Sequence, residues 1–342
     1  MPTGEFAADL SLDGNQQGGT AKVPAQMLAT VSIAGDLSSG DWAISGLVGA
    51  VTVKGTTHDW SLGSGGSPVA GVTSLTLGVV EQAALYVTQK VGTLKTIAWA
   101  AGSVHAGSVA TLTVTGKAAV APKGLIPGAP AIAGDFLADV ALTGNGAVKG
   151  VAMGKATISG GLRGCDWDIT GSLTSLTVTG TVGGPAGGDA VQVKTTGAMG
   201  ALTFGAANQA DFLAGVTPSA AGDSAVTRRA DAAADFLTGN IKSVTIKPAK
   251  GVVGPCFTNS NFSAAAIGAS TIVNPVYNND SAGLTETQDD FGFWTKSGVG
   301  VGIVSVKCID TTAPKDTTKN WTWKPGQPAP AILDDLHVQP VA

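Results

Sequence analysis

The residues best placed to bind a ligand are two Asp-Trp dipeptides, Asp41-Trp42 and Asp166-Trp167, which stand at the same point of two similar segments. An aromatic ring beside a carboxylate can stack on a sugar and accept hydrogen bonds from its hydroxyls. Packing is the alternative role, in which the indole covers one end of a core and the carboxylate accepts hydrogen bonds in a turn. Recurrence at equivalent positions favours packing. The candidate carbohydrate-binding residues are Trp42, Trp167, Trp294, Trp321 and Trp323.

A second group of candidate ligands is the acidic, amide-rich segment between Asn278 and Asp290. Carboxylate and amide oxygens are the ligands that Ca²⁺ prefers. The segment lacks both the EF-hand spacing and the Gly-Gly-x-Gly-x-Asp repeat of calcium-binding β-rolls. A solvated loop is therefore favoured, and Ca²⁺ is the only cofactor that the sequence suggests. The candidate metal ligands are Asn279, Asp280, Glu286, Asp289 and Asp290.

The three cysteines, Cys165, Cys256 and Cys308, form no Cys-x-x-Cys pair, and the three histidines are scattered. Zinc-site spacing is therefore missing from the sequence. Cys256 and Cys308 fall in the same C-terminal region and could form a disulfide. Three free, buried thiols are the equally favoured alternative.

Motifs of the main catalytic classes are missing as well. The sequence contains no Gly-x-Ser-x-Gly, no His-Glu-x-x-His and no phosphate-binding loop. A polysaccharide lyase needs clustered acidic, Lys or Arg groups, and only Arg163, Arg228 and Arg229 are present. With so few arginines there is no basic stripe for nucleic acid either. We therefore expect a protein that is not an enzyme and does not bind nucleic acid.

Composition narrows the class of protein further. Gly makes up 49 of 342 residues, charged residues only 13%, and mean hydropathy is +0.26. Disorder would need lower hydrophobicity and more charge. No run of about 18 apolar residues occurs, so we expect no transmembrane segment. The first residues lack the features of a signal peptide, and we expect the sequence to begin on a mature fragment.

Short runs that alternate apolar and small polar residues recur along the chain and predict strands with one buried face. Two of these runs are Leu112-Thr-Val-Thr-Gly116 and Leu176-Thr-Val-Thr-Gly180. Several of the spacings between successive runs are close to 20 residues. Strands this short must stack to be stable. Three strands per roughly 20 residues would indicate the triangular coil of a parallel β-helix, with Gly at its corners.

A longer repeat is also present. Residues 31–46 align without gaps to residues 156–171, and residues 4–15 match residues 134–145. The sequence therefore predicts an all-β parallel β-helix (β-solenoid) with short irregular insertions, and antiparallel β-sandwich repeats are the alternative. Spacing over residues 223–237 predicts one short helix. The expected division is residues 1–130 and 131–215 as two repeat units, 216–310 as a divergent third unit, and 311–342 as an extended segment.

Three segments, residues 241–251, 260–268 and 291–308, resemble repeats in very large β-solenoid surface proteins of planctomycetes and related bacteria. The resemblance implies an envelope location and a structural role, and it brings no catalytic residues. We therefore expect a structural protein of the bacterial cell surface or extracellular matrix that assembles with copies of itself through low-charge faces and open solenoid edges. An adhesin or carbohydrate-binding module that binds cell-surface glycans is the second hypothesis. A polysaccharide-degrading β-helix enzyme is the third.

Overall fold

The computed structural model describes residues 4–13, 26–123, 127–184, 189–217, 233–249, 252, 254–276, 291–296, 302–311, 320–327 and 336–341. Strands dominate these residues, and the 3-10 turn η2 (Ala233–Asp235) is the only helix among them. The chain divides into two compact units, Met1–Gly160 and Gly161–Ala342. Their boundary lies inside the second of the four segments predicted from the sequence. No described helix is long and apolar enough to cross a membrane.

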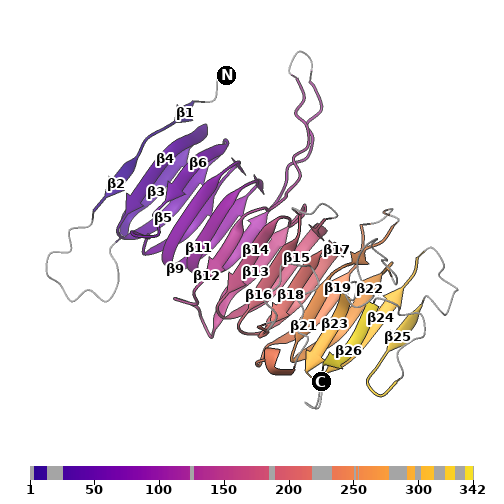
Figure 1. The fold of residues 1–342 in the computed structure, drawn as a ribbon. Helices are drawn as coiled ribbons and strands as arrows, with labels where there is room; N and C mark the ends of the chain where they lie inside the picture. The colour runs from indigo at the N-terminus through magenta and orange to yellow at the C-terminus, as the bar shows by residue number, and fades with distance from the viewer. Residues whose placement is uncertain are drawn as a thin grey trace, which may run out of the picture. The chain divides into compact units, whose positions relative to one another are not determined.

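Unit 1 consists of short strands joined by tight corners (Figure 1). In chain order they are Glu5–Phe6 (β1), Leu10–Leu12 (β2), Gln26–Ile33 (β3), Asp36–Ile44 (β4), Leu47–Val53 (β5), Thr57–Leu62 (β6), Gly71–Thr76 (β7), Val79–Val80 (β8), Ala83–Thr96 (β9), Ala98–Trp99 (β10), Gly102–Val114 (β11), Asp139–Leu142 (β12) and Val151–Ile158 (β13).

Most strands of unit 1 pair in parallel in two rows, and the short strands β8 and β10 pair in parallel with each other beside them. The hydroxyl row, named for its outward side chains, comprises β3, β5, β7, Lys90–Thr96 of β9, Ser108–Val114 of β11, and β13. The acidic row comprises β1 and β2 on β4, then β6, Ala83–Val87 of β9, Gly102–Ala106 of β11, and β12. The long strands β9 and β11 belong to both rows.

The register of these pairs shows how many strands lie between equivalent positions. Leu37 of β4 pairs with Thr57 of β6, twenty residues later. Lys90 of β9 pairs with Ser108 of β11, eighteen residues later. Between Leu37 and Thr57 the chain contains β4 and β5, whereas between Val79 of β8 and its partner Ala98 of β10 it contains β8 and both parts of β9. The three predicted strand segments of residues 31–53 lie in β3, β4 and β5, and three strands per repeat stays a prediction.

Alternate side chains of each strand point inward and stack on their register partners in the next strand. Trp42 of β4 pairs with Leu62 of β6, which pairs with Leu85 of β9. All three are almost fully buried. Burial of these stacked apolar side chains is the main stabilising term, at about 1.5–3 kcal/mol for each large side chain.

A column of glycines crosses the hydroxyl row. Gly49, Gly92 and Gly154 alternate along it with strands that carry Thr73 or Ala110 at the same level. A Cβ on Gly92 would overlap the carbonyl oxygen of Thr73, and one on Gly154 would overlap that of Ala110. Every second strand therefore requires Gly at this position, which accounts for part of the glycine content.

Unit 2 repeats the same organisation with larger insertions between strands. Its strands are Cys165–Ile169 (β14), Ser172–Gly183 (β15), Val191–Thr195 (β16), Met199–Asn208 (β17), Ala210–Ala214 (β18), Asn240–Ile246 (β19), Phe257–Thr258 (β20), Asn261–Ala264 (β21), Ala266–Val273 (β22), Phe291–Lys296 (β23), Ile303–Ile309 (β24), Trp321–Trp323 (β25) and Leu336–Val341 (β26).

Two parallel rows build unit 2 as well. One row runs β15, β17, β19, β22, β24 and the other runs β14, β16, β18, β21, β23, β26. Phe204 of β17 and Phe212 of β18 stack at a centroid distance of 4.9 Å. The core therefore lies between the rows. Phe212 continues through Phe262 and Phe293 in three register-matched strands, with centroids 5.0 and 5.1 Å apart.

Insertions leave the register unchanged. Residues 117–132 form a hairpin with antiparallel bridges between Lys117 and Ile132 and between Val120 and Ala129 (Figure 1). The chain then rejoins the acidic row, where Ser103 pairs with Asp139. Most of the predicted helix over residues 223–237 lies outside the described residues, and residues 233–235 form the 3-10 turn.

These observations decide the coarse fold class. The chain is nearly all β and its strand pairing is mostly parallel, as predicted. The alternative of antiparallel sandwich repeats is wrong, since β24–β25 is the only antiparallel pair of described strands. The C-terminal segment is not merely extended: β25 pairs with β24, and β26 continues the row after β23.

Candidate functional site

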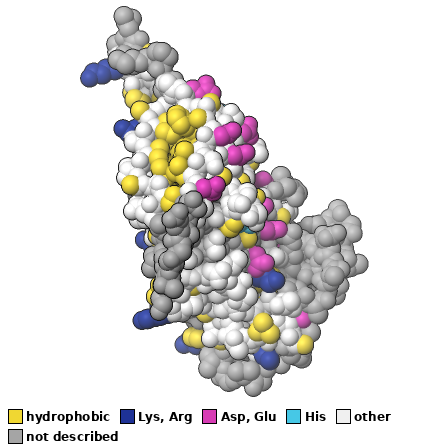
Figure 2. Space-filling model, turned by 90° about the vertical axis from the view of Figure 1, so that its left-hand side faces the viewer, with side chains coloured by type: hydrophobic (Ala, Val, Ile, Leu, Met, Phe, Trp, Pro, Cys, Tyr) yellow, Lys and Arg dark blue, Asp and Glu magenta, His cyan; other side chains and the backbone are white. Residues whose placement is uncertain are grey.

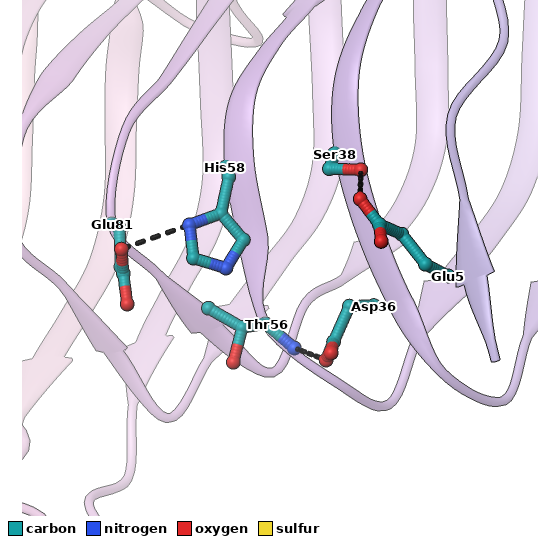
Figure 3. Close-up of polar contacts among 6 residues, drawn as sticks. All are labelled: Glu5, Asp36, Ser38, Thr56, His58 and Glu81. Atoms are coloured by element: carbon teal, nitrogen blue, oxygen red, sulfur yellow. Dashed lines mark hydrogen bonds and ion pairs between the residues drawn. The ribbon is translucent and has the colours of Figure 1, made fainter. Parts of the chain in front are cut away.

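The outward side of the acidic row in unit 1 carries a series of polar contacts (Figure 3). Ser38 of β4 and His58 of β6 are register partners. The Ser38 hydroxyl donates a hydrogen bond to the Glu5 carboxylate on β1. His58 Nδ1 lies 2.8 Å from a carboxylate oxygen of Glu81, with both side chains largely exposed. These four side chains thus extend across three strands and the corner before β9.

Three further hydrogen bonds tie neighbouring strands of this row together. Asp36 Oδ1 accepts one from the Thr56 backbone N–H at 2.7 Å. Asp41 is part of a chain, because its own N–H donates to Asp9 Oδ1 at 2.9 Å and its Oδ1 accepts from the Ser61 hydroxyl at 2.6 Å. These carboxylates therefore accept hydrogen bonds from a neighbouring strand, and this contact helps to hold the strands together.

Charge on this face has a single sign, apart from any His that is protonated. The strands and corners of the acidic row, residues 4–13, 36–44, 57–62, 79–87, 98–106 and 135–142, contain no Lys or Arg. The register places these carboxylates on neighbouring strands, and neighbouring strands in a sheet lie about 4.8 Å apart. We call this surface the acidic face. Its exposed carboxylates are those of Glu5, Asp9, Asp13, Asp41, Asp59, Glu81 and Asp139.

The outward side of the hydroxyl row has the opposite character. Its strands contain no Asp or Glu, and Lys90, Lys95 and Lys155 are exposed on them, with Lys54 directly after β5. Figure 2 shows acidic side chains gathered toward one edge of the view and most Lys side chains toward the other. We call this surface the hydroxyl face. Its two outward columns are Thr30, Ala50, Ser74, Thr93, Thr111, Lys155 and Ser32, Thr52, Thr76, Lys95, Thr113, Thr157.

Unit 2 has hydroxyl columns in its equivalent row. One column is threonine on four successive strands, and the neighbouring column alternates serine with alanine. No strand of this row from β17 to β24 contains a carboxylate. Their members are Thr177, Thr203, Thr245, Thr271, Lys307 and Ser175, Ala201, Ser243, Ala269, Ser305.

The other row of unit 2 carries a buried polar cluster on its outward side. Asn261 Nδ2 donates to Asp211 Oδ1 at 2.9 Å, and Trp294 Nε1 donates to Asn261 Oδ1 at 2.8 Å. The Trp294 indole stacks on the His337 imidazole with a centroid distance of 5.4 Å. Leu213, Val216, Phe236 and Trp294 pack together beside this cluster. The Asn261 amide thus joins strands β18, β21 and β23.

The structure corrects three of the five tryptophan candidates. Trp42 and Trp167 are each 1% exposed, and Trp294 is 3% exposed, so none presents a ring face to a sugar. The packing interpretation of the two Asp-Trp dipeptides is confirmed for their indoles. Both rings fill the core at equivalent positions of β4 and β14, as the sequence repeat requires.

Trp321 and Trp323 are half-buried on β25. Trp323 Nε1 donates to the Gln327 carbonyl in the following turn at 3.2 Å. A depression of about 330 Å³ lies beside Trp321 and is also lined by Lys307, Asn320 and Thr322. This combination of an aromatic edge with amide, hydroxyl and ammonium groups suits a polar ligand.

The remaining predicted sites have different outcomes. The candidate calcium ligands Asn279, Asp280, Glu286, Asp289 and Asp290 all lie outside the described residues. The disulfide between Cys256 and Cys308 is not formed: all three cysteines are free and buried. Burial raises the pKa of the Cys256 thiol and, more strongly, that of Cys308.

Sequence reasoning missed two features. The Asp211–Asn261 contact joins residues fifty positions apart across an insertion, and no local pattern signals it. The separation of charge onto two faces did have a signal, since Asp41 and Glu81 lie in one series of alternate strands and corners while Lys95 and Lys155 lie in the other. Recognising this separation of charge requires the strand register, which shows which strands belong to the same row.

Comparison with known proteins yields no similarity to report: no family model matches, no curated protein matches, and no solved structure matches.

Proposed function

We propose that each unit is a β-solenoid and that the protein has a structural role at the bacterial cell surface or in the extracellular matrix. The observation that supports this most directly is the parallel register between stacked strands, which are offset by 18 to 26 residues wherever no long insertion intervenes. Such a chain buries its core only by adding one coil on the next, and each coil contacts only its neighbours. The resemblance to β-solenoid surface proteins of planctomycetes agrees with this proposal.

The use of polar side chains supports a structural role over catalysis. Asp36 and Asp41 accept hydrogen bonds from the following strand, and Asn261 holds β18, β21 and β23 together. These polar groups stabilise the stacking of one coil on the next through hydrogen bonds. We propose that the protein is not an enzyme and that copies associate into a regular layer or filament.

Open strand edges are one route to such association. Among the described strands, β3 pairs only with β5, and β1 and β2 pair only with β4. Their free backbone groups are able to pair with another chain. Electron micrographs of the native cell surface, labelled with an antibody against this chain, test the proposal. Label on a periodic layer or fibre supports it, and label confined to the cell interior contradicts it.

Glycan binding is the second candidate, and the depression beside Trp321 favours it. In this alternative, the indole stacks on a sugar while Asn320 and Lys307 contact its hydroxyls. A glycan array on the purified protein tests it, with Trp321→Ala as the variant. Lys324→Ala in the adjacent turn is the matched control. Binding that is lost in the first variant and retained in the second supports an adhesin, whereas no binding by the native protein excludes this ligand class.

A further inference from the structure

The two outward faces of unit 1 carry charge of opposite sign, and neither is covered by another part of unit 1 among the described strands. We infer that the acidic face of one copy binds the hydroxyl face of a second copy. This inference rests on the proposed structural role and names the surface that would join copies. Its occupant is the same chain, because one unit carries both members of the complementary pair.

Charge supplies the first argument. The acidic face presents the exposed carboxylates of Asp41 and Glu81, among others, and contains no Lys or Arg. The hydroxyl face presents Lys95 and Lys155 and no carboxylate. Opposed potentials of this kind accelerate encounter and fix which faces meet, whereas acidic–acidic contact is repulsive. Two acidic faces therefore cannot pair, and neither can two hydroxyl faces.

Shape supplies the second argument. Threonine, serine and alanine side chains fill most outward positions of the hydroxyl face, so only the lysines rise above a low, even surface. The six strands of the row, at about 4.8 Å each and about six residues long, give a face of roughly 600 Å². Contact between two such faces would bury roughly 1,200 Å² in total, at the lower limit of the standard size for specific interfaces. Association should therefore be concentration-dependent.

The symmetry of the contact follows from its chemistry. Because the two faces that meet are different, each bound pair of copies leaves one face of each kind free. Such a heterologous contact does not close on itself unless its rotation forms a ring, and otherwise it adds copies in an open series. This result links the charge separation to a layer or filament rather than to a dimer.

The experiment uses two double variants of the full chain. Lys95→Glu with Lys155→Glu replaces two exposed lysines of the hydroxyl face by carboxylates, and Asp41→Lys with Glu81→Lys replaces two exposed carboxylates of the acidic face by lysines. Sedimentation velocity at 20 mM and 500 mM salt measures association. The native protein should form large species at low salt that dissociate at high salt. Each double variant alone should remain monomeric at concentrations at least about tenfold above those at which the native protein associates.

An equimolar mixture of the two double variants should associate again, because each now complements the other. The matched control is Lys117→Glu with Lys123→Glu, which makes the same change in net charge on the hairpin away from both faces and should associate like the native protein. Circular dichroism and thermal unfolding establish that each variant folds. If the reversals unfold the chain, Lys95→Gln with Lys155→Gln should still weaken association.

Other outcomes separate this inference from the proposed function. Association that both double variants retain, or a mixture that stays monomeric, overturns this interface while leaving a structural role through strand edges in place. A native protein that is monomeric at low salt also overturns the interface, and labelled micrographs of the native cells then decide the structural role. Binding of a soluble polyanion to the Lys95 face without self-association points to a different partner and likewise contradicts the inference.

Discussion

The phenyl ring of Phe262 lies flat against that of Phe212, with centroids 5.0 Å apart and planes inclined by 8°. The two residues are register partners on β18 and β21, although fifty positions separate them in the sequence. Strands β19 and β20 and the connections around them lie between the two residues in the chain, and β21 still pairs with β18 in register. Stacking of identical side chains therefore survives insertions that would obscure any repeat in the sequence.

Phe262→Ala should lower the free energy of unfolding by about 3–5 kcal/mol, because it removes a fully buried ring and leaves a cavity between Phe212 and Phe293. Urea unfolding monitored by circular dichroism measures the loss. Phe6→Ala is the control, since Phe6 is 42% exposed and should cost much less. Equal losses in the two variants would show that the aromatic stack is not part of the stable core.

Gly92→Ala should destabilise unit 1 by about 1–3 kcal/mol, because the added Cβ would overlap the Thr73 carbonyl oxygen and force the strands apart. Thr73→Ala lies at the same level of the adjacent strand, where a side chain is already accommodated, and should change stability little. Thermal unfolding compares the two. If Gly92→Ala unfolds at the same temperature as the native protein, the glycine column tolerates side chains on every strand.

Asn261→Ala should cost about 1–3 kcal/mol, because it removes the amide that bonds to Asp211 and Trp294 within a buried cluster. Tryptophan fluorescence reports the change, since the Trp294 indole loses its acceptor. Ser38→Ala, which removes an exposed hydrogen bond to Glu5, is the control and should have a small effect. If Asn261 holds the three strands together, Asn261→Ala should lower stability more than Ser38→Ala does.

Cys308 should make stability depend on alkaline pH. Burial raises the pKa of its thiol above the ordinary value, so the folded protein keeps the thiol neutral under conditions in which the unfolded chain ionises it. The contribution of the neutral Cys308 thiol to the free energy of unfolding is complete below the ordinary thiol pKa. This contribution is lost as pH rises above that value, by up to about 1.4 kcal/mol per pH unit.

Urea unfolding at pH 8 and pH 10 measures this loss, and Cys308→Ala should reduce it. A reductant should leave the unfolding midpoint of the native protein unchanged, because all three cysteines are free. A midpoint that falls on reduction would instead indicate a disulfide.

The local pattern predicted where strands occur, since alternation of apolar and small polar residues depends only on one face being buried. Every run singled out, including Leu112–Gly116 and Leu176–Gly180, lies in or overlaps a strand. The number of strands per repeat could not be predicted in this way. A bulge or bend inside a strand resembles a turn in sequence, as Gly107 does within β11.

The candidate sites were less accessible to prediction. Trp42 and Trp321 are the same residue type, and only the core position of β4 buries the first while the edge strand β25 half-exposes the second. Cys256 and Cys308 fall in the same C-terminal region, yet position along a chain with insertions says little about the approach of two sulfur atoms.

Insertions differ greatly in length while the register beneath them is kept: Ser103 pairs with Asp139, and Asp211 with Asn261. The connections between strands are therefore sites where sequence can be added without altering the framework. Each connection can carry a different recognition loop, with the spacing between loops set by the distance between strands. A chain built in this way can diversify what it presents to its surroundings while its interior stays the same.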